Sequence, residues 1–171
     1  IKSVILGGNI TSIENEAFYN SSIKSISMKN VKTIGDLAFA NTELMDVELP
    51  NTLETIGKRA FKSAKFTHIN IPDSVSEMCE GAFVGCSSLE NITFDADNVE
   101  FIDDIYELFE GCENLSAFYG KCASEDNRCL IINNTLYSFI PKDLTEYIIP
   151  QGITKLEDSA FVLCNYINNK I

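Results

Sequence analysis

The stretch FTHINIPDSVSEMCEGAFVGCSSL, residues 66–89, contains one complete copy of the unit from which this chain is built. Its apolar positions Phe66, Ile69 and Ile71 follow the pattern apolar-x-x-apolar-x-apolar, and the alternation at its end is typical of a strand buried on one face. Pro72 lacks an amide donor, so the strand is expected to end there. The stretch therefore predicts a short β-strand followed by a turn.

A second apolar pair in this stretch, Val75 and Met78, predicts a second extended segment. Equivalent pairs recur in most copies of the unit: Ile10/Ile13, Val31/Ile34, Leu53/Ile56, Val99/Ile102 and Ile153/Leu156. Gly35 and Gly57 directly follow their pairs, where we expect a tight turn.

The dipeptide Ala82-Phe83 ends the unit and recurs along the chain at spacings of 21, 22 and 22 residues over its first four copies. The copies are Ala17-Phe18, Ala38-Phe39, Ala60-Phe61, Ala82-Phe83 and Ala160-Phe161, with Leu108-Phe109 as a variant. A unit this short cannot bury its own apolar side, so each coil must stack on its neighbours. We expect the six Phe rings to form one column along the stack.

Alignment on these rings gives seven strand starts: Ile1, Ile23, Leu44, Phe66, Leu89, Leu115 and Leu144. The expected inward pairs are Val4/Leu6, Ile26/Met28, Val47/Leu49, Ile69/Ile71, Ile92/Phe94 and Tyr147/Ile149, with Phe118/Gly120 degenerate. Strands of successive coils would be parallel neighbours about 4.8 Å apart. We predict a β-rich α/β solenoid of right-handed coils of about 22 residues, with short helical turns at the Ala-Phe units.

The coil that starts at Leu115 departs from the pattern, because it is 29 residues long and has no Ala-Phe unit. We assign residues 119–143 to an inserted loop and β-hairpin. Two strand-like runs, Cys129 to Ile132 and Thr135 to Phe139, flank Asn133-Asn134, a pair suited to a hairpin turn. Ser124 to Arg128 is expected to be a polar loop leading into the hairpin.

Residues 1–171 are expected to form a single domain, because 45% apolar content supports one sizeable core. Ile1 opens directly on a strand, and Ile167 falls where another strand is due. Both observations suggest part of a longer array.

The composition excludes several classes of partner. With 13 Lys and Arg against 25 Asp and Glu, the net charge is -12, and such a surface repels nucleic acid and anionic lipid. The longest apolar runs are a few residues, far short of the roughly 20 that span a bilayer. We expect a monomer that binds no nucleic acid and inserts into no membrane.

The repeat resembles a known family. Leu44-x-x-Val47-x-Leu49 is similar to the general leucine-rich-repeat strand, although the Asn that usually follows is missing. The unit of residues 66–89, and Ile149-Pro150-x-Gly152-Ile153 followed by Ala160-Phe161-x-x-Cys164, resemble the BspA-like repeat of bacterial surface proteins. The stretch 123–139 also looks like an insertion found in such proteins. The resemblance implies a leucine-rich-repeat solenoid at the cell surface or secreted, with adhesion to host or bacterial surface proteins in some members, and no catalytic residues or cofactor.

The residues themselves offer little catalytic chemistry. His68 is the only histidine, it lies at an outward strand position, and no nucleophile motif accompanies it. No paired Cys-x-x-Cys or His motif completes a zinc site. We therefore expect no enzyme, no cofactor and no metal.

Three cysteines, Cys86, Cys112 and Cys164, share one position of the repeat that holds small residues in other coils. Reduced core thiols are the favoured interpretation. A Cys86–Cys112 bridge between adjacent coils and a Cys122–Cys129 bridge within the insertion remain open alternatives.

If the sheet face binds a partner, the outward residues carry the binding. They are Asp46, Glu48, His68, Asn70, Asn91, Thr93, Tyr119 and Glu146. Tyr119 is the best anchor, because Tyr combines contact area with a low ordering cost. Following the resemblance, the leading hypothesis is an adhesin-like interaction module; the alternatives are a structural spacer without its own ligand and a glycan-binding module.

Overall fold

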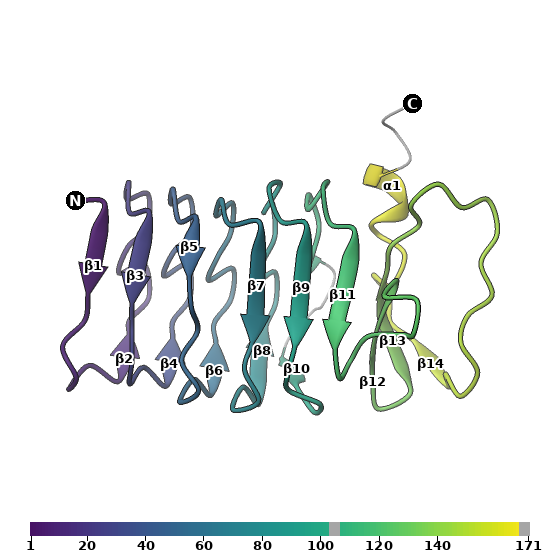
Figure 1. Ribbon diagram of the computed structural model, residues 1–171, viewed down its shortest axis with the longest axis horizontal. Coiled ribbons are helices and arrows are strands. Elements are labelled where there is room, and N and C mark those ends of the chain that lie inside the picture. The colour runs from purple at the N-terminus through teal and green to yellow at the C-terminus, as the bar shows by residue number, and fades with distance from the viewer. Residues whose placement is uncertain (103–106, 168–171) are drawn as a thin grey trace.

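The computed structural model describes residues 1–102 and 107–167, which form a row of stacked coils (Figure 1). One side of the row carries β1 (Ser3–Ile5), β3 (Ser25–Ser27), β5 (Asp46–Val47), β7 (His68–Ile71), β9 (Asn91–Phe94) and β11 (Ala117–Gly120). These strands pair in parallel in the orders β1-β3-β5 and β11-β9-β7. We call this side the front face.

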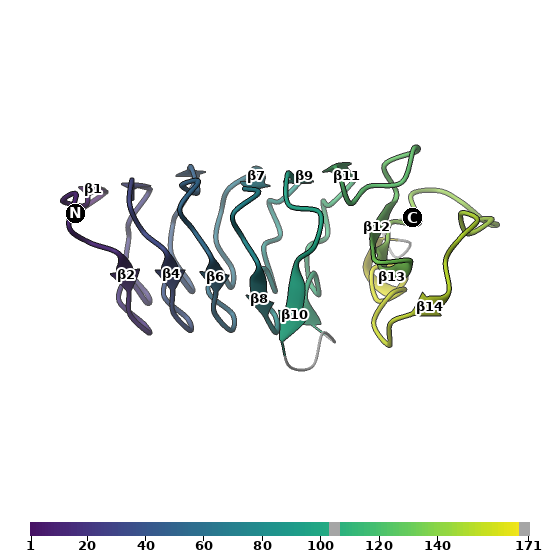
Figure 2. The same cartoon turned by 90° about the horizontal axis from the view of Figure 1, so that it is seen from below.

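The second apolar pairs form the other side of the row, as predicted (Figure 2). They give β2 (Ser12–Ile13), β4 (Thr33–Ile34), β6 (Thr55–Ile56), β8 (Glu77–Cys79) and β10 (Glu100–Ile102), joined in parallel in chain order. We call this side the back face. The repeat therefore correctly predicts the front strands from β1 to β11 and the back strands from β2 to β10.

The ring column is confirmed for five of the six rings. Successive rings of Phe18, Phe39, Phe61, Phe83 and Phe109 stack with centroids 5.2–6.2 Å apart and planes within 4–8°. The prediction is wrong for Phe161, whose ring instead packs at a tilt of 55° on Phe139. The inserted hairpin separates Phe161 from the column.

The Ala-Phe units form short turns, as predicted, and the first four copies contain no regular helix. Leu37 and Asn41, for example, flank Ala38-Phe39 with φ of 55° and 57°, and such left-handed residues interrupt a helix. The amide of Phe39 consequently donates to the carbonyl of Ala60 in the next coil, at 2.8 Å. The turns thus add a ladder of hydrogen bonds along the stack.

Gly35 and Gly57 are needed because neighbouring coils approach closely. A Cβ built on Gly35 would lie 2.7 Å from the backbone nitrogen of Asn15, and one on Gly57 would lie 2.6 Å from the carbonyl carbon of Gly35. Neither glycine has a left-handed φ. The prediction located the critical glycines, but their role is to leave room between coils.

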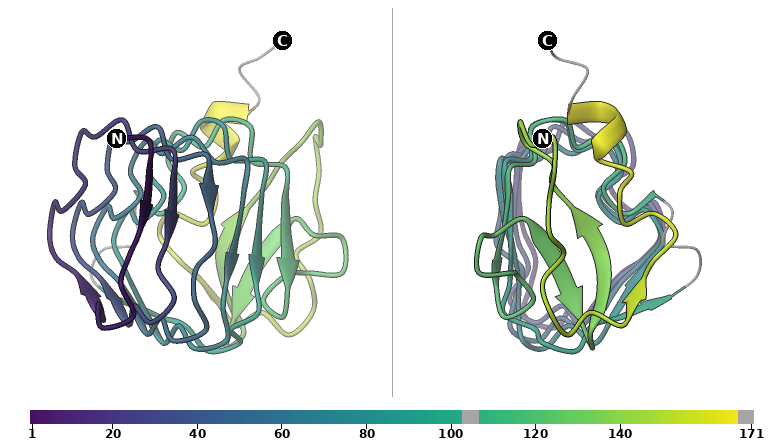
Figure 3. Two further views of the ribbon diagram at one scale, coloured as in Figure 1. Left: turned by 60° about the vertical axis from the view of Figure 1, so that its left-hand side comes forward. Right: turned by 90° about the vertical axis from the view of Figure 1, so that its right-hand side faces the viewer.

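The hairpin prediction is confirmed. β12 (Cys129–Ile132) pairs antiparallel with β13 (Thr135–Phe139), and Asn133 and Asn134 have φ of 50° and 60°, as a tight hairpin turn requires. The hairpin lies across the end of the stack, within the outline of the coils (Figure 3). It joins the main core through Leu130 and Ile132.

The last coil uses the hairpin as its neighbour. β14 (Lys155–Leu156) pairs in parallel with β13, and the amide of Phe139 donates to the carbonyl of Ala160 at 2.8 Å. This bond matches the one from Phe39 to Ala60, so β13 and Phe139 occupy the place of a regular coil without an Ala-Phe dipeptide. A second, smaller core between the hairpin and the last coil contains Leu136, Phe139 and Ala160.

The predicted seventh front strand is wrong, although its expected inward residues Tyr147 and Ile149 do pack, half-buried, against the second core. No residue between 141 and 154 belongs to a strand. The edge of β11 on which it would pair is occupied by the inserted loop, because the amide of Phe118 donates to the carbonyl of Asn127 at 2.8 Å. Ile167 is the last residue of α1 (Cys164–Ile167), and the strand expected to follow from it lies outside the described residues.

Candidate interaction surface

The front face displays two rows of outward side chains. In one row His68 pairs with Asn91, and Asn91 pairs with Ala117, which is buried; in the other Asn70 pairs with Thr93 and Thr93 with Tyr119. The inward neighbours Ile69 and Ile92 are buried. Because side chains alternate between the faces of a strand, successive coils place their outward residues side by side.

The structure brings seven of the eight candidate binding residues to this face. Asp46, Glu48, His68 and Asn70 are exposed, Asn91 and Thr93 are half-buried, and Tyr119 is 43% exposed. Glu146 is exposed but lies in the irregular stretch after the hairpin. Its predicted position on a strand is wrong, for the reason that displaces the seventh strand.

Charged residues that the prediction missed line the end of the front strands. The Asn70 amide donates to Asp95 at 2.7 Å, and the Lys121 ammonium lies 3.0 Å from Asp73 and 3.9 Å from Asp97. The hydrogen bond to Asp73, aided by the nearby carboxylates, raises the pKa of Lys121. These residues follow the front strands of adjacent coils. Charged residues at this repeated position in the sequence could therefore have predicted the cluster.

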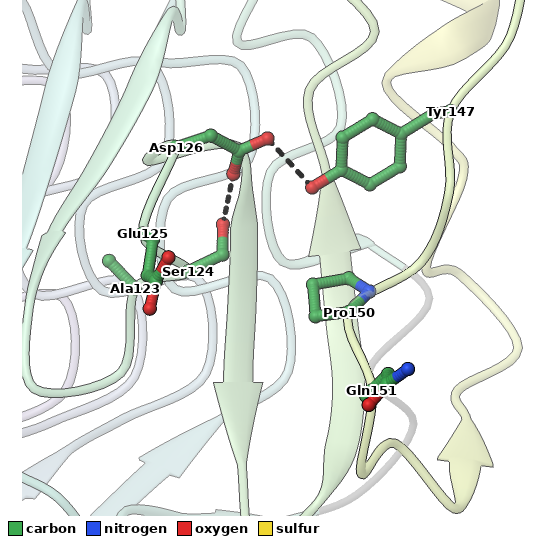
Figure 4. A pocket seen from close by; sticks show the side chains of 7 residues that line it. All are labelled: Ala123, Ser124, Glu125, Asp126, Tyr147, Pro150 and Gln151. Carbon is green, nitrogen blue, oxygen red and sulfur yellow. Dashed lines mark hydrogen bonds between the residues drawn. The ribbon is translucent and has the colours of Figure 1, made fainter.

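A pocket of about 580 Å³ opens between the inserted loop and the irregular stretch. Residues 123–126 form one side, and Tyr147, Pro150 and Gln151 form the other (Figure 4). The prediction identified the polar loop but missed the pocket, because it placed Tyr147 in a front strand. In the irregular stretch Tyr147 is half-buried against the second core, and its hydroxyl reaches the loop.

Asp126 organises this pocket. Its carboxylate accepts hydrogen bonds from the Ser124 hydroxyl at 2.6 Å and the Tyr147 hydroxyl at 2.8 Å. Partial burial opposes ionisation, but these bonds, with the amide and charge of Arg128, outweigh it and lower the pKa of Asp126. Burial, together with hydrogen bonds to Cys129 and Asp126, raises the pKa of Tyr147. The aspartate is therefore ionised and the tyrosine neutral near pH 7.

All six cysteines are free thiols. Neither Cys86 and Cys112 nor Cys122 and Cys129 are bridged, and the favoured interpretation of reduced core thiols agrees with this. The Cys86 thiol donates to the carbonyl of Phe61 in the preceding coil at 3.1 Å, and burial raises its pKa to about 12. A thiol that is protonated at neutral pH is a poor nucleophile and metal ligand.

Other chemistry finds little support in the described residues. Within the described residues, the His68 ring has one hydrogen-bond contact, to the hydroxyl of the adjacent Thr67 at 3.1 Å, and no carboxylate completes a triad. Within residues 1–102 and 107–167, no group of three or more His, Cys, Asp or Glu side chains is arranged to hold a metal ion. In the same ranges no helix has the length and apolar character needed to cross a membrane.

Comparison with known sequences matches residues 11–126 and 130–171 to the BspA type leucine rich repeat region, in six copies. No curated protein matches.

Two solved structures share the fold. A leucine-rich repeat protein from Bacteroides ovatus is 23% identical with a TM-score of 0.63, over 98% of this chain and 48% of its own. One from Eubacterium ventriosum is 22% identical with a TM-score of 0.59, over 94% of this chain and 44% of its own. The chain thus spans about half the length of these relatives.

Proposed function

Because the chain belongs to the BspA-type leucine-rich-repeat family, we propose that it is an adhesin-like interaction module that binds a partner protein through its front face. The module acts at the cell surface or after secretion, as a monomer, and its partners are host or bacterial surface proteins. It performs no catalysis.

The continuity of the outward rows carries this proposal. The register runs unbroken from His68 to Asn91 and from Asn70 through Thr93 to Tyr119, so a partner crossing the face meets a fixed array of side chains. Such an array favours binding through many weak contacts on a rigid support, which limits the entropy lost on association. Tyr119 supplies aromatic area beside the polar groups.

The test is a binding assay of the chain on immobilised host matrix proteins and bacterial surface proteins. The front variant combines Asp46→Ala, His68→Ala and Tyr119→Ala. The control combines Ser12→Ala, Glu77→Ala and Glu100→Ala on the back face, where all three side chains are also exposed. The proposal expects saturable binding that the front variant loses and the back variant keeps.

The other outcomes separate the alternatives. Binding that both variants retain would remove the front face from the proposal, and binding to no protein would favour a spacer. Retention on a glycan array instead would favour the glycan-binding alternative. Light scattering of the eluted chain checks the monomer, and surface labelling of intact source cells checks the location.

A further inference from the structure

The pocket between residues 123–126 and the stretch carrying Tyr147, Pro150 and Gln151 is formed by the inserted loop and the irregular stretch, not by the regular coils. We propose that it receives the guanidinium group of an arginine side chain from a partner protein. This site is separate from the outward rows of the front face, and the inference does not rest on the proposed function of that face.

The charge of the pocket points to a cation. Glu125 and Asp126 both line it, and its lining contains no Lys or Arg. The nearest arginine in sequence, Arg128, donates through Nη1 to the carbonyls of Ile140, Pro141 and Lys142 at 3.2–3.3 Å. That guanidinium is hydrogen-bonded at the end of the hairpin, and although its charge also acts on Asp126, Glu125 leaves the pocket with negative charge for a ligand.

The carboxylates of Asp126 and Glu125 differ in how firmly they are held. Asp126 is held in place by Ser124 and Tyr147, and a carboxylate with about four acceptor positions retains capacity for a further donor. Within the described residues, Glu125 forms no hydrogen bond or ion pair, and it is exposed. A fixed acceptor beside an adaptable one suits a group that presents several donors.

The opposite wall distinguishes arginine from smaller cations. The Tyr147 hydroxyl points to the loop and donates to Asp126, the Tyr147 ring packs at a tilt on Phe139 with centroids 4.5 Å apart, and Pro150 lies near the ring (Figure 4). The side chain of arginine has an apolar stem that packs on such surfaces and a planar head that stacks on aromatic rings. Its fork of donors also bridges two carboxylates, whereas a lysine ammonium is a single point charge.

The probe is the peptide Ac-Gly-Arg-Gly-NH2, titrated into the chain and followed by NMR. The expected result is saturable shifts confined to the amides of residues 123–126 and to Tyr147 and Gln151. The lysine peptide should bind more weakly. The citrulline peptide, which keeps the shape and loses the charge, should bind about tenfold more weakly, the change expected when one charged hydrogen-bonded contact is lost.

Matched variants locate the contact. Glu125→Gln and Asp126→Asn should each weaken arginine-peptide binding several-fold, while Asp97→Asn, at an exposed carboxylate near the front strands, should leave it unchanged. Because the Glu125 side chain holds no other part of the structure, its variant remains informative even if Asp126→Asn disturbs the loop. Equal binding of the citrulline peptide, shifts elsewhere on the surface, or full binding by Glu125→Gln would each overturn the proposal.

Discussion

Between β1 and β10 each coil stacks on a near copy of itself, whereas beyond β11 the last coil stacks on a hairpin of unrelated sequence. In the regular region the rings of Phe39 and Phe61 lie 5.4 Å apart and within 6° of parallel. In the second region the rings of Phe139 and Phe161 are tilted by 55°. The backbone bond from Phe139 to Ala160 nevertheless matches that from Phe39 to Ala60.

This difference separates two sources of order in the solenoid. The backbone hydrogen bonds between coils form wherever an extended segment presents its carbonyls and amides, whatever side chains that segment carries. Parallel ring packing needs more than equivalent positions: Phe139 and Phe161 occupy equivalent places, but Phe139 also packs on Tyr147 with centroids 4.5 Å apart, and the two Phe rings are tilted. The core accordingly divides into a main cluster and a smaller one around Leu136 and Phe139, and the pocket lies where the insertion replaces a regular front strand.

The largest effect should come from removing a ring inside the column. Phe61 is fully buried between two stacked rings, so Phe61→Ala should lower the free energy of unfolding by about 3–5 kcal/mol. Phe161, which is 40% exposed, is its matched control, and Phe161→Ala should cost about 1 kcal/mol. Urea denaturation measures both, and equal losses would remove the distinction between the two regions.

The second effect concerns the point where the regions meet. A Cβ on Gly120 would overlap the carbonyl oxygen of Phe94, so Gly120→Ala should cost more than about 2 kcal/mol through strain and displaced backbone. Gly152 also has a left-handed φ, of 91°, but nothing lies within 4 Å of its added Cβ. Gly152→Ala should therefore cost only about 1 kcal/mol, and thermal unfolding that ranks them the other way would contradict the close approach at Gly120.

The sequence predicts the regular region well, because the same pattern of strand and turn residues recurs in each copy of the repeat. Ile34 and Ile56 occupy equivalent positions and pair in the structure, so one correct alignment places all the regular strands. The reason for Gly35 could not be found in this way. Its requirement comes from the backbone of Asn15 in the preceding coil, and sequence spacing does not measure that separation.

The second region was predicted poorly because two segments, the inserted loop and the stretch around Tyr147, could each pair with the edge of β11. The pattern around Tyr147 and Ile149 fits a front strand, and only the bond from Phe118 to Asn127 shows that the position beside β11 is taken. Local patterns do not report which of two segments pairs with a given edge. The outward residues from Asp46 to Tyr119 were placed correctly for the same reason that the regular strands were, whereas the pocket depended on the unpredicted competition.

A smaller effect should come from the buried Cys86 thiol of the regular region, which makes stability depend on pH. Cys86 is neutral in the folded chain until its pKa of about 12, compared with 9.0 for an ordinary thiol. Between these values the unfolded chain has released the proton that the folded chain retains, so stability falls as pH rises. Urea unfolding from pH 8 upward should show this decline, and Cys86→Ser, which keeps a donor for the Phe61 carbonyl, should make it shallower. An unchanged slope in the variant would show that other groups cause the decline.

The smallest effect compares a hydrogen bond at the pocket with an ion pair of the regular region. Lys32 and Glu54 lie 2.9 Å apart with both side chains more than half exposed, so Lys32→Met should change stability by less than about 0.5 kcal/mol. Tyr147→Phe removes the hydroxyl that donates to Asp126 at 2.8 Å and should cost about 1 kcal/mol, because a hydrogen bond to a charged carboxylate is stronger than one between neutral groups. Its amide shifts should be confined to residues 123–126 and 147–151, since the front strands bond to one another without this network. If Tyr147→Phe instead matched Lys32→Met in stability and left those amides unmoved, the irregular stretch would be held by packing alone, and the position of Asp126 would not depend on the tyrosine.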